Sequence, residues 1–167
     1  MPISCMRSVA VCSIALLLLV LSPKLAPAAG NASYANQRYG FSLSWPAGHY
    51  SVREADNGDG ITVTDGRGLE LRAWGSNSPG ALDERLSDVL KTQAQTFSKV
   101  TYKAVKAGEG WFVLSGIREG KIAWIKVFCG KETLYAVDVS YPANAKKRYD
   151  ALISTVNKSF APPRGWR

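Results

Sequence analysis

The second half of the chain contains four strand-like segments whose connections are too short for a crossover. Apolar and β-branched residues dominate the segments at about 100–106, 111–117, 121–129 and 133–141. Each connection between them is only a few residues long and most contain glycine. Parallel neighbours need a crossover of about a dozen residues. The four segments therefore predict consecutive antiparallel strands of one sheet.

Three further strands are predicted in the first half. Residues 39–45 alternate strictly, with Tyr39, Phe41, Leu43 and Trp45 on one side, and Pro46 ends the run. Segments 61–64 and 69–74 flank a turn whose Asp-Gly dipeptide favours a tight hairpin.

Two segments have the periodicity of amphipathic helices. Ser78 is a good N-cap and Pro79 suits the first helical position, with Asp83 and Glu84 in the first turn. The apolar stripe of this helix comprises Leu82, Leu86, Val89, Leu90 and Phe97. A second helix is predicted from about 143 to 160, with a stripe of Tyr149, Leu152, Ile153, Val156 and Phe160. The order βββ-α-ββββ-α predicts an α+β fold, with a mainly antiparallel sheet of six to seven strands and two helices.

The N-terminal thirty residues have the pattern of an export signal peptide. Arg7 is followed by the apolar run 9–21 and then by small residues, which places cleavage near 28–32. The apolar run is shorter than the ~20 residues of a spanning helix, although a retained anchor is the alternative. We then expect a short linker at 31–38, a single domain at 39–160 and a flexible tail at 161–167.

Cleavage changes both the thiol content and the charge. Cys5 and Cys12 leave with the leader, so Cys129 is alone, and its apolar strand predicts a buried side chain. The net charge of +8 falls to +6 when Arg7 and Lys24 are lost. A basic exported domain suits an anionic envelope component. Nucleic acid is not an expected partner, because the compartment is wrong and no binding motif is found.

The segment Tyr39-Gly40-Phe41-Ser42-Leu43-Ser44-Trp45-Pro46 resembles the opening strand of PsbP-like domains (the PsbP/DcrB/LpqN type). The resemblance extends over about 34–160 and includes the element order. It implies an α-β-α sandwich and, for many members, an exported or membrane-associated accessory role without known catalysis. DcrB-type relatives are lipoproteins, but neither Cys5 nor Cys12 stands just after the apolar run, so lipidation is not expected here.

Few residues suit catalysis or metal binding. His49 is the only histidine, and no nucleophile-elbow motif is found, so a Ser-His-Asp triad would depend on His49 standing beside a carboxylate and a serine. The loop 56–60 resembles a calcium loop, but Gly58, Gly60 and Arg67 occupy three of its ligand positions, which favours an ordinary Asx-Gly turn. No cofactor or metal site is expected.

The strand alternation also suggests a binding surface. If the registers agree, one sheet face gathers aromatic and charged residues, a mixture enriched at binding surfaces. These residues are Arg72, Trp74, Trp124, Lys126 and Asp138. The sequence therefore favours a non-catalytic periplasmic or secreted accessory or binding domain, acting through an unknown protein, envelope or ligand contact. The alternative is a small hydrolase-like periplasmic enzyme that uses His49 or Cys129.

Overall fold

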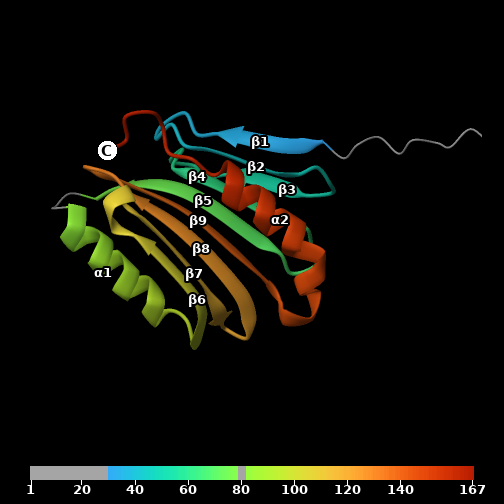
Figure 1. Ribbon diagram of the computed structural model, residues 1–167. Helices are drawn as coiled ribbons and strands as arrows, with labels where there is room; N and C mark the ends of the chain where they lie inside the picture. The colour runs from blue at the N-terminus through green and yellow to red at the C-terminus, as the bar shows by residue number, and fades with distance from the viewer. Residues whose placement is uncertain (1–29, 79–81) are drawn as a thin grey trace, which may run out of the picture.

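The computed structural model describes residues 30–78 and 82–167, and a seven-stranded antiparallel sheet forms its centre (Figure 1). In spatial order the strands are β3 (Ser51–Glu54), β4 (Gly60–Thr64), β5 (Glu70–Asn77), β9 (Thr133–Pro142), β8 (Lys121–Cys129), β7 (Trp111–Arg118) and β6 (Lys99–Lys106). The four predicted strands of the second half are consecutive neighbours, as their short connections require. β9 lies in the middle, because it pairs with both β5 and β8.

Each face of the sheet carries its own layer. Helix α1 (Leu82–Gln95) covers one face, which we call the α1 face. Helix α2 (Lys146–Ser159) and the two-stranded sheet of β1 (Asn31–Ala35) and β2 (Ser42–Pro46) cover the other, the α2 face (Figure 1). Short 3₁₀ turns at Ala107–Glu109 (η1) and Ala143–Ala145 (η2) precede β7 and α2. The predicted α+β class and layered architecture are confirmed.

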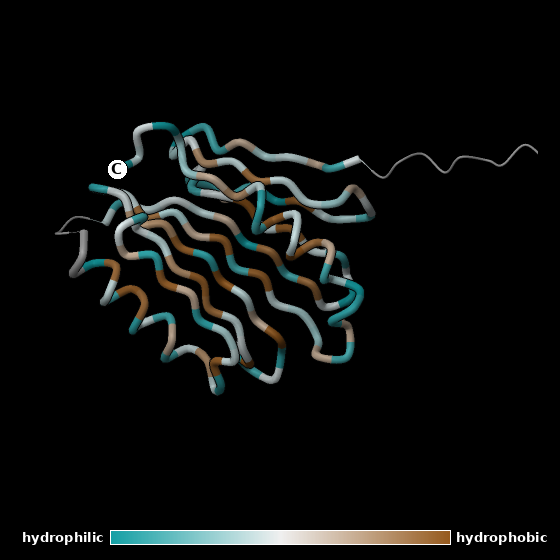
Figure 2. Tube along the Cα trace, viewed as in Figure 1, coloured by the Kyte–Doolittle hydropathy of each residue, from teal (hydrophilic) through white to brown (hydrophobic). Residues whose placement is uncertain are grey.

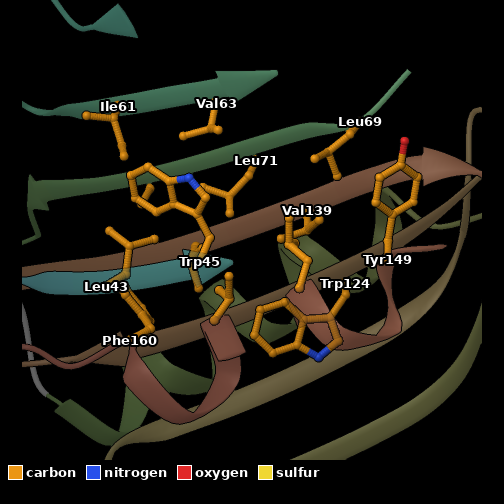
Figure 3. Packing of buried hydrophobic residues seen from close by; sticks show 14 of the residues in the cluster. Leu43, Trp45, Ile61, Val63, Leu69, Leu71, Trp124, Val139, Tyr149 and Phe160 are labelled. Carbon is orange, nitrogen blue, oxygen red and sulfur yellow. The ribbon is translucent and has the colours of Figure 1, made fainter. Parts of the chain in front are cut away.

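Strand alternation supplies apolar side chains to both layers, and Figure 2 shows the resulting hydrophobic bands across the sheet. On β8, Ile125 and Val127 face α1, whereas Trp124 and Phe128 face α2. On the α2 face, the ring of Trp45 from β2 lies over the sheet near Leu71 (Figure 3), and it is only 3 % exposed. A strand buried on both sides alternates between two cores rather than between core and water.

Two segments outside the predicted domain are part of the fold. Residues 31–38 are not a linker, because Asn31–Ala35 forms β1 and pairs antiparallel with β2. The C-terminal tail is not a flexible extension, because Ala161 exchanges backbone hydrogen bonds with Ser42 and Trp166 packs edge-on against Phe128 and Tyr135.

The sequence analysis does not predict β3. Its four residues are all exposed and show no apolar alternation.

Some predictions fall on residues that the structure does not describe. The signal peptide predicted at 1–30 lies outside the described residues except for Gly30, and so does the helical position predicted for Pro79. The same holds for the side chains of Asp83 and Glu84. Of the helices within 30–78 and 82–167, none is long and apolar enough to cross a membrane.

The β1–β2 hairpin is attached to the main sheet by Asn36, which is 3 % exposed. Its side-chain amide donates hydrogen bonds to the Tyr34 hydroxyl at 2.9 Å and to the Gly58 carbonyl at 2.8 Å. Its side-chain oxygen accepts a hydrogen bond from the Tyr39 amide at 2.6 Å. One side chain therefore shapes the hairpin turn and joins it to the β3–β4 loop.

We predict that Asn36→Ala lowers the free energy of unfolding by about 2–3 kcal/mol, because it leaves buried polar groups without partners. Urea unfolding followed by circular dichroism measures the change. Asn144→Ala is the matched control, since Asn144 is exposed in η2. Equal midpoints for the two variants would show that Asn36 does not hold the hairpin.

Candidate functional site

The register divides the five predicted surface residues between the two faces. Arg72 pairs with Asp138 across β5 and β9, so these two residues share the α1 face with Trp74. Asp138 also pairs with Ile125 on β8, which turns Trp124 and Lys126 to the α2 face. The prediction of one common face is therefore wrong. The β8–β9 connection sets which residues of the two strands share a face, and alternation within each strand does not reveal this parity.

Trp124 and Lys126 belong to the packing beside α2. Trp124 is only 7 % exposed. The Lys126 ammonium donates a 2.9 Å hydrogen bond to the Asn157 carbonyl near the end of α2. It also lies 5.5 Å and 5.1 Å from the ring centroids of Trp111 and Phe128. Burial lowers the pKa of Lys126. Through these contacts, Lys126 connects the sheet to the C-terminal end of α2.

The other three residues line a polar cleft on the α1 face, with a volume of about 480 Å³. We call it the α1-face cleft. Its floor is formed by β5, β9 and the ends of β7 and β8, and its side by the end of α1. The lining residues are Glu70, Arg72, Trp74, Gln93, Thr96, Arg118, Glu119, Lys121, Asp138 and Ser140.

An ion pair between a buried carboxylate and a largely buried guanidinium forms the base of the cleft. Asp138 is 4 % exposed on the central strand β9, and its carboxylate accepts a 2.5 Å hydrogen bond from the Arg118 guanidinium. The hydrogen bond that Arg118 donates to Asp138 raises the pKa of Arg118, against the opposing effect of burial. The guanidinium also lies 5.4 Å from the ring centroid of Phe97, just after α1. The pair therefore connects β9, β7 and the α1–β6 connection.

The rim of the cleft is more open. On β5, the Arg72 Nε lies 3.3 Å from the Glu70 Oε1, and the side chains of Glu70 and Arg72 are 46 % and 52 % exposed. A second depression of about 260 Å³, which Asp59 and Thr62 help to line, shares Arg72 and Trp74 with the cleft. The indole of Trp74 therefore stands between two hollows.

Glu119 borders the cleft in a backbone conformation that few residues adopt. It has φ = 51° in the turn between β7 and β8, followed by Gly120 at φ = 73°. Two successive left-handed residues are typical of a tight hairpin turn, where Asn-Gly or Gly-Gly is preferred. The turn places Glu119 beside the cleft, although glutamate rarely adopts this left-handed backbone conformation.

We predict that Asp138→Ala destabilises the protein by about 3 kcal/mol, because it leaves the largely buried Arg118 guanidinium without its carboxylate. The double variant Arg118→Met/Asp138→Leu is expected to recover most of this loss, since neither charge is then buried. Thermal and urea unfolding measure both. Asp150→Asn is the control, because the Lys146–Asp150 pair is exposed and such pairs contribute little. A double variant as unstable as Asp138→Ala would contradict this view of the ion pair.

His49 lies in a separate small pocket of about 180 Å³, with Tyr50, Asp65, Arg67, Arg148 and Tyr149. Asp65 is a carboxylate, but none of these lining residues is a serine, so the arrangement that a His49 hydrolase requires is not assembled there. The Asp65 carboxylate instead accepts hydrogen bonds from the Tyr149 hydroxyl at 2.6 Å and from the backbone amides of Arg67 and Leu69. The pocket joins the β4–β5 turn to α2.

We predict that Asp65 makes stability depend on acid pH. Burial acts to raise the pKa of Asp65, but the hydrogen bonds from Tyr149, Arg67 and Leu69 outweigh it and the pKa is lowered. A lowered pKa in the folded state stabilises the protein above the unfolded value of about 3.9, and this stability is lost as pH falls below it. Unfolding midpoints between pH 6 and pH 2 should therefore fall less steeply in Asp65→Asn. Parallel curves for the two proteins would refute this role.

Cys129 and the loop 56–60 have structural surroundings. Cys129 is fully buried, and burial raises the pKa of its thiol to about 11, so it is an uncharged core residue near neutral pH. The Asp59 amide donates to the Asn57 side chain, which confirms the predicted Asx turn. Arg38 occupies oxygens of the same loop, at Asn57 and Asp59. In the described part of the chain, no three His, Cys, Asp or Glu side chains cluster as metal ligands would.

Comparison with known proteins identifies the architecture. No family model matches the chain, and no curated protein matches it. The chain does superpose on the solution structure of cyanobacterial PsbP (CyanoP) from Synechocystis sp. PCC 6803, with a TM-score of 0.56 and 16 % identity. The match covers 86 % of this chain and 98 % of that one. This chain has a PsbP-like fold. The predicted resemblance is confirmed at the level of fold, which at this identity carries no function with it.

The sequence did not single out Glu70, Arg118 or Lys121 as residues of the α1-face cleft. Glu70 and Arg72 alternate with apolar residues of β5, so their shared side was visible in the sequence. Arg118 and Lys121 flank a turn, where charged residues are common, and only the strand pairing shows that they face Asp138's side of the sheet.

Proposed function

We propose that this PsbP-like domain is a non-catalytic binding domain that works outside the cytoplasm and engages its partner through the α1-face cleft. The observation that carries the proposal is the cleft itself. It combines a partly exposed tryptophan with exposed charged side chains on a floor fixed by the central strands. Sites built on rigid strands hold their geometry better than sites on loops.

The sequence supports the proposed compartment. The pattern of Arg7, the apolar run and the small residues near 28–32 is that of a cleaved leader. Cys129 is free and buried in the described chain, so folding in that compartment requires no disulfide within residues 30–78 and 82–167. A partner outside the cytoplasm would be an envelope component, another exported protein or a small ligand.

Capture in native cells tests the function. The full chain with a C-terminal affinity tag is expressed in its own host, crosslinked in intact cells and recovered from the envelope fraction. Mass spectrometry of the recovered protein reads its N-terminus, which is expected between residues 28 and 32. A component crosslinked to wild type should be lost, by at least fivefold, in Arg72→Ala and in Trp74→Phe.

Arg164→Ala is the matched control, because Arg164 is exposed in the tail that packs on the α2 side. Its capture is expected to equal that of wild type. Equal capture by wild type, the cleft variants and the control would overturn the cleft as the binding site. Recovery from the cytoplasm with an intact N-terminus would overturn the compartment.

A further inference from the structure

We propose that the α1-face cleft binds an uncharged saccharide, which stacks on Trp74 and forms hydrogen bonds with the surrounding side chains. This inference rests on the proposed binding function and names the chemical class of its ligand. It follows from the charge balance, the hydrogen-bonding groups and the aromatic surface of the cleft.

The charges of the cleft balance one another. Its acidic residues are Glu70, Glu119 and Asp138, and its basic residues are Arg72, Arg118 and Lys121. Four of these six form ion pairs within the cleft, Arg118 with Asp138 and Arg72 with Glu70. A site for an anion or a cation presents an excess of the opposite charge. A balanced lining favours an uncharged ligand instead.

The cleft nevertheless offers many hydrogen-bonding groups side by side. Carboxylates only accept and guanidinium groups only donate, whereas the Gln93 amide and the Ser140 hydroxyl do both. The Thr96 hydroxyl donates to the Gln93 backbone carbonyl at 2.8 Å and can still accept. The Glu70–Arg72 pair places acceptors and donors together and leaves about half of each side chain exposed. Each hydroxyl of a sugar ring both donates and accepts, so neighbouring hydroxyls match such a mixed lining.

Trp74 supplies the apolar surface that one face of a sugar ring requires. It lines both the 480 Å³ cleft and the adjoining 260 Å³ depression. It also packs against the core beneath α1, which fixes its position. The volume of the cleft lies within the usual range for small-ligand sites. A ring stacked on Trp74 can extend as a short oligosaccharide from one hollow into the other.

Titration with defined sugars tests the inference on the full folded chain. Chitotriose, cellotriose and maltotriose are added to ¹⁵N-labelled protein, and the indole N–H signal of Trp74 is followed by NMR. Trp74→Phe assigns this signal among the five tryptophans. At least one of these sugars is expected to shift the Trp74 signal saturably, together with amides of β5 and of the β7–β8 turn.

Variants place the binding in the cleft. Trp74→Ala should raise the dissociation constant at least tenfold. Trp74→Phe should raise it by less, since a smaller aromatic surface remains. Gln93→Ala should raise it about threefold without loss of folding, because this side chain lines the cleft and is only partly buried. Arg164→Ala should bind as wild type does. Variants with wild-type affinity at Trp74 and Gln93 would overturn the proposed site.

Two other probes separate the outcomes. Saturable shifts of Trp74 with glycine betaine or inorganic phosphate, but with none of the sugars, would overturn the saccharide and show a zwitterionic or an anionic ligand instead. If none of the probes binds while envelope capture still depends on Arg72 and Trp74, the saccharide class is wrong but the binding function stands. If none of the probes binds and the Arg72 and Trp74 variants capture as much as wild type, both proposals fail.

Discussion

The ion pair between Asp138 and Arg118 marks the boundary on which the organisation of the α1 face depends. Along β9, the side chains on this face change from Leu134 and Ala136 to Asp138 and Ser140. On β5 the change comes at the same level, from Trp74 to Arg72. On β8 and β7 it comes later, because Ile125 and Leu114 are still apolar beside Asp138 and the charged residues Lys121 and Arg118 lie at the ends of the strands. α1 packs on the apolar end and leaves the polar end open. A carboxylate at the centre of a sheet is tolerated because the Arg118 guanidinium, from the next strand but one, reaches it and itself packs on the ring of Phe97.

The two faces of the sheet are therefore covered in different ways. On the α2 face, the β1–β2 hairpin, α2 and the tail form a continuous layer, in which Asn36, Trp45 and Trp166 connect segments that are distant in the sequence. Apolar burial of this extent provides the main stabilisation of a domain without disulfides. On the α1 face, a single helix covers part of the sheet, and the uncovered part provides a cleft with a rigid floor. Both faces contribute a buried core, but only the α1 face keeps an open polar end.

The sequence predicted what depends on local pattern and missed what depends on pairing. Alternation in Tyr39–Trp45 and short connections after residue 106 identified strands, and the stripe of Tyr149, Leu152 and Val156 identified α2, because burial imposes these periods directly. β1 and β3 escaped prediction because their side chains are largely exposed, so no apolar period marks them. The site was half predicted for a similar reason. Arg72, Trp74 and Asp138 share a face, but the parity between β8 and β9 is a property of their connection, and a shift of one residue moves Trp124 and Lys126 to the opposite face.

The polar end of the α1 face is not explained by the needs of folding. An apolar pair of similar volume in place of a buried ion pair is often neutral or stabilising, since it avoids the cost of removing two charges from water. Glu119 adds a second departure from the stablest choice, because its turn position favours asparagine or glycine. Departures of this kind are expected where a surface is kept for binding. The charges of Asp138 and Arg118 compensate each other at the base, which leaves Trp74, Gln93 and the Glu70–Arg72 pair as the groups that the proposed ligand would contact.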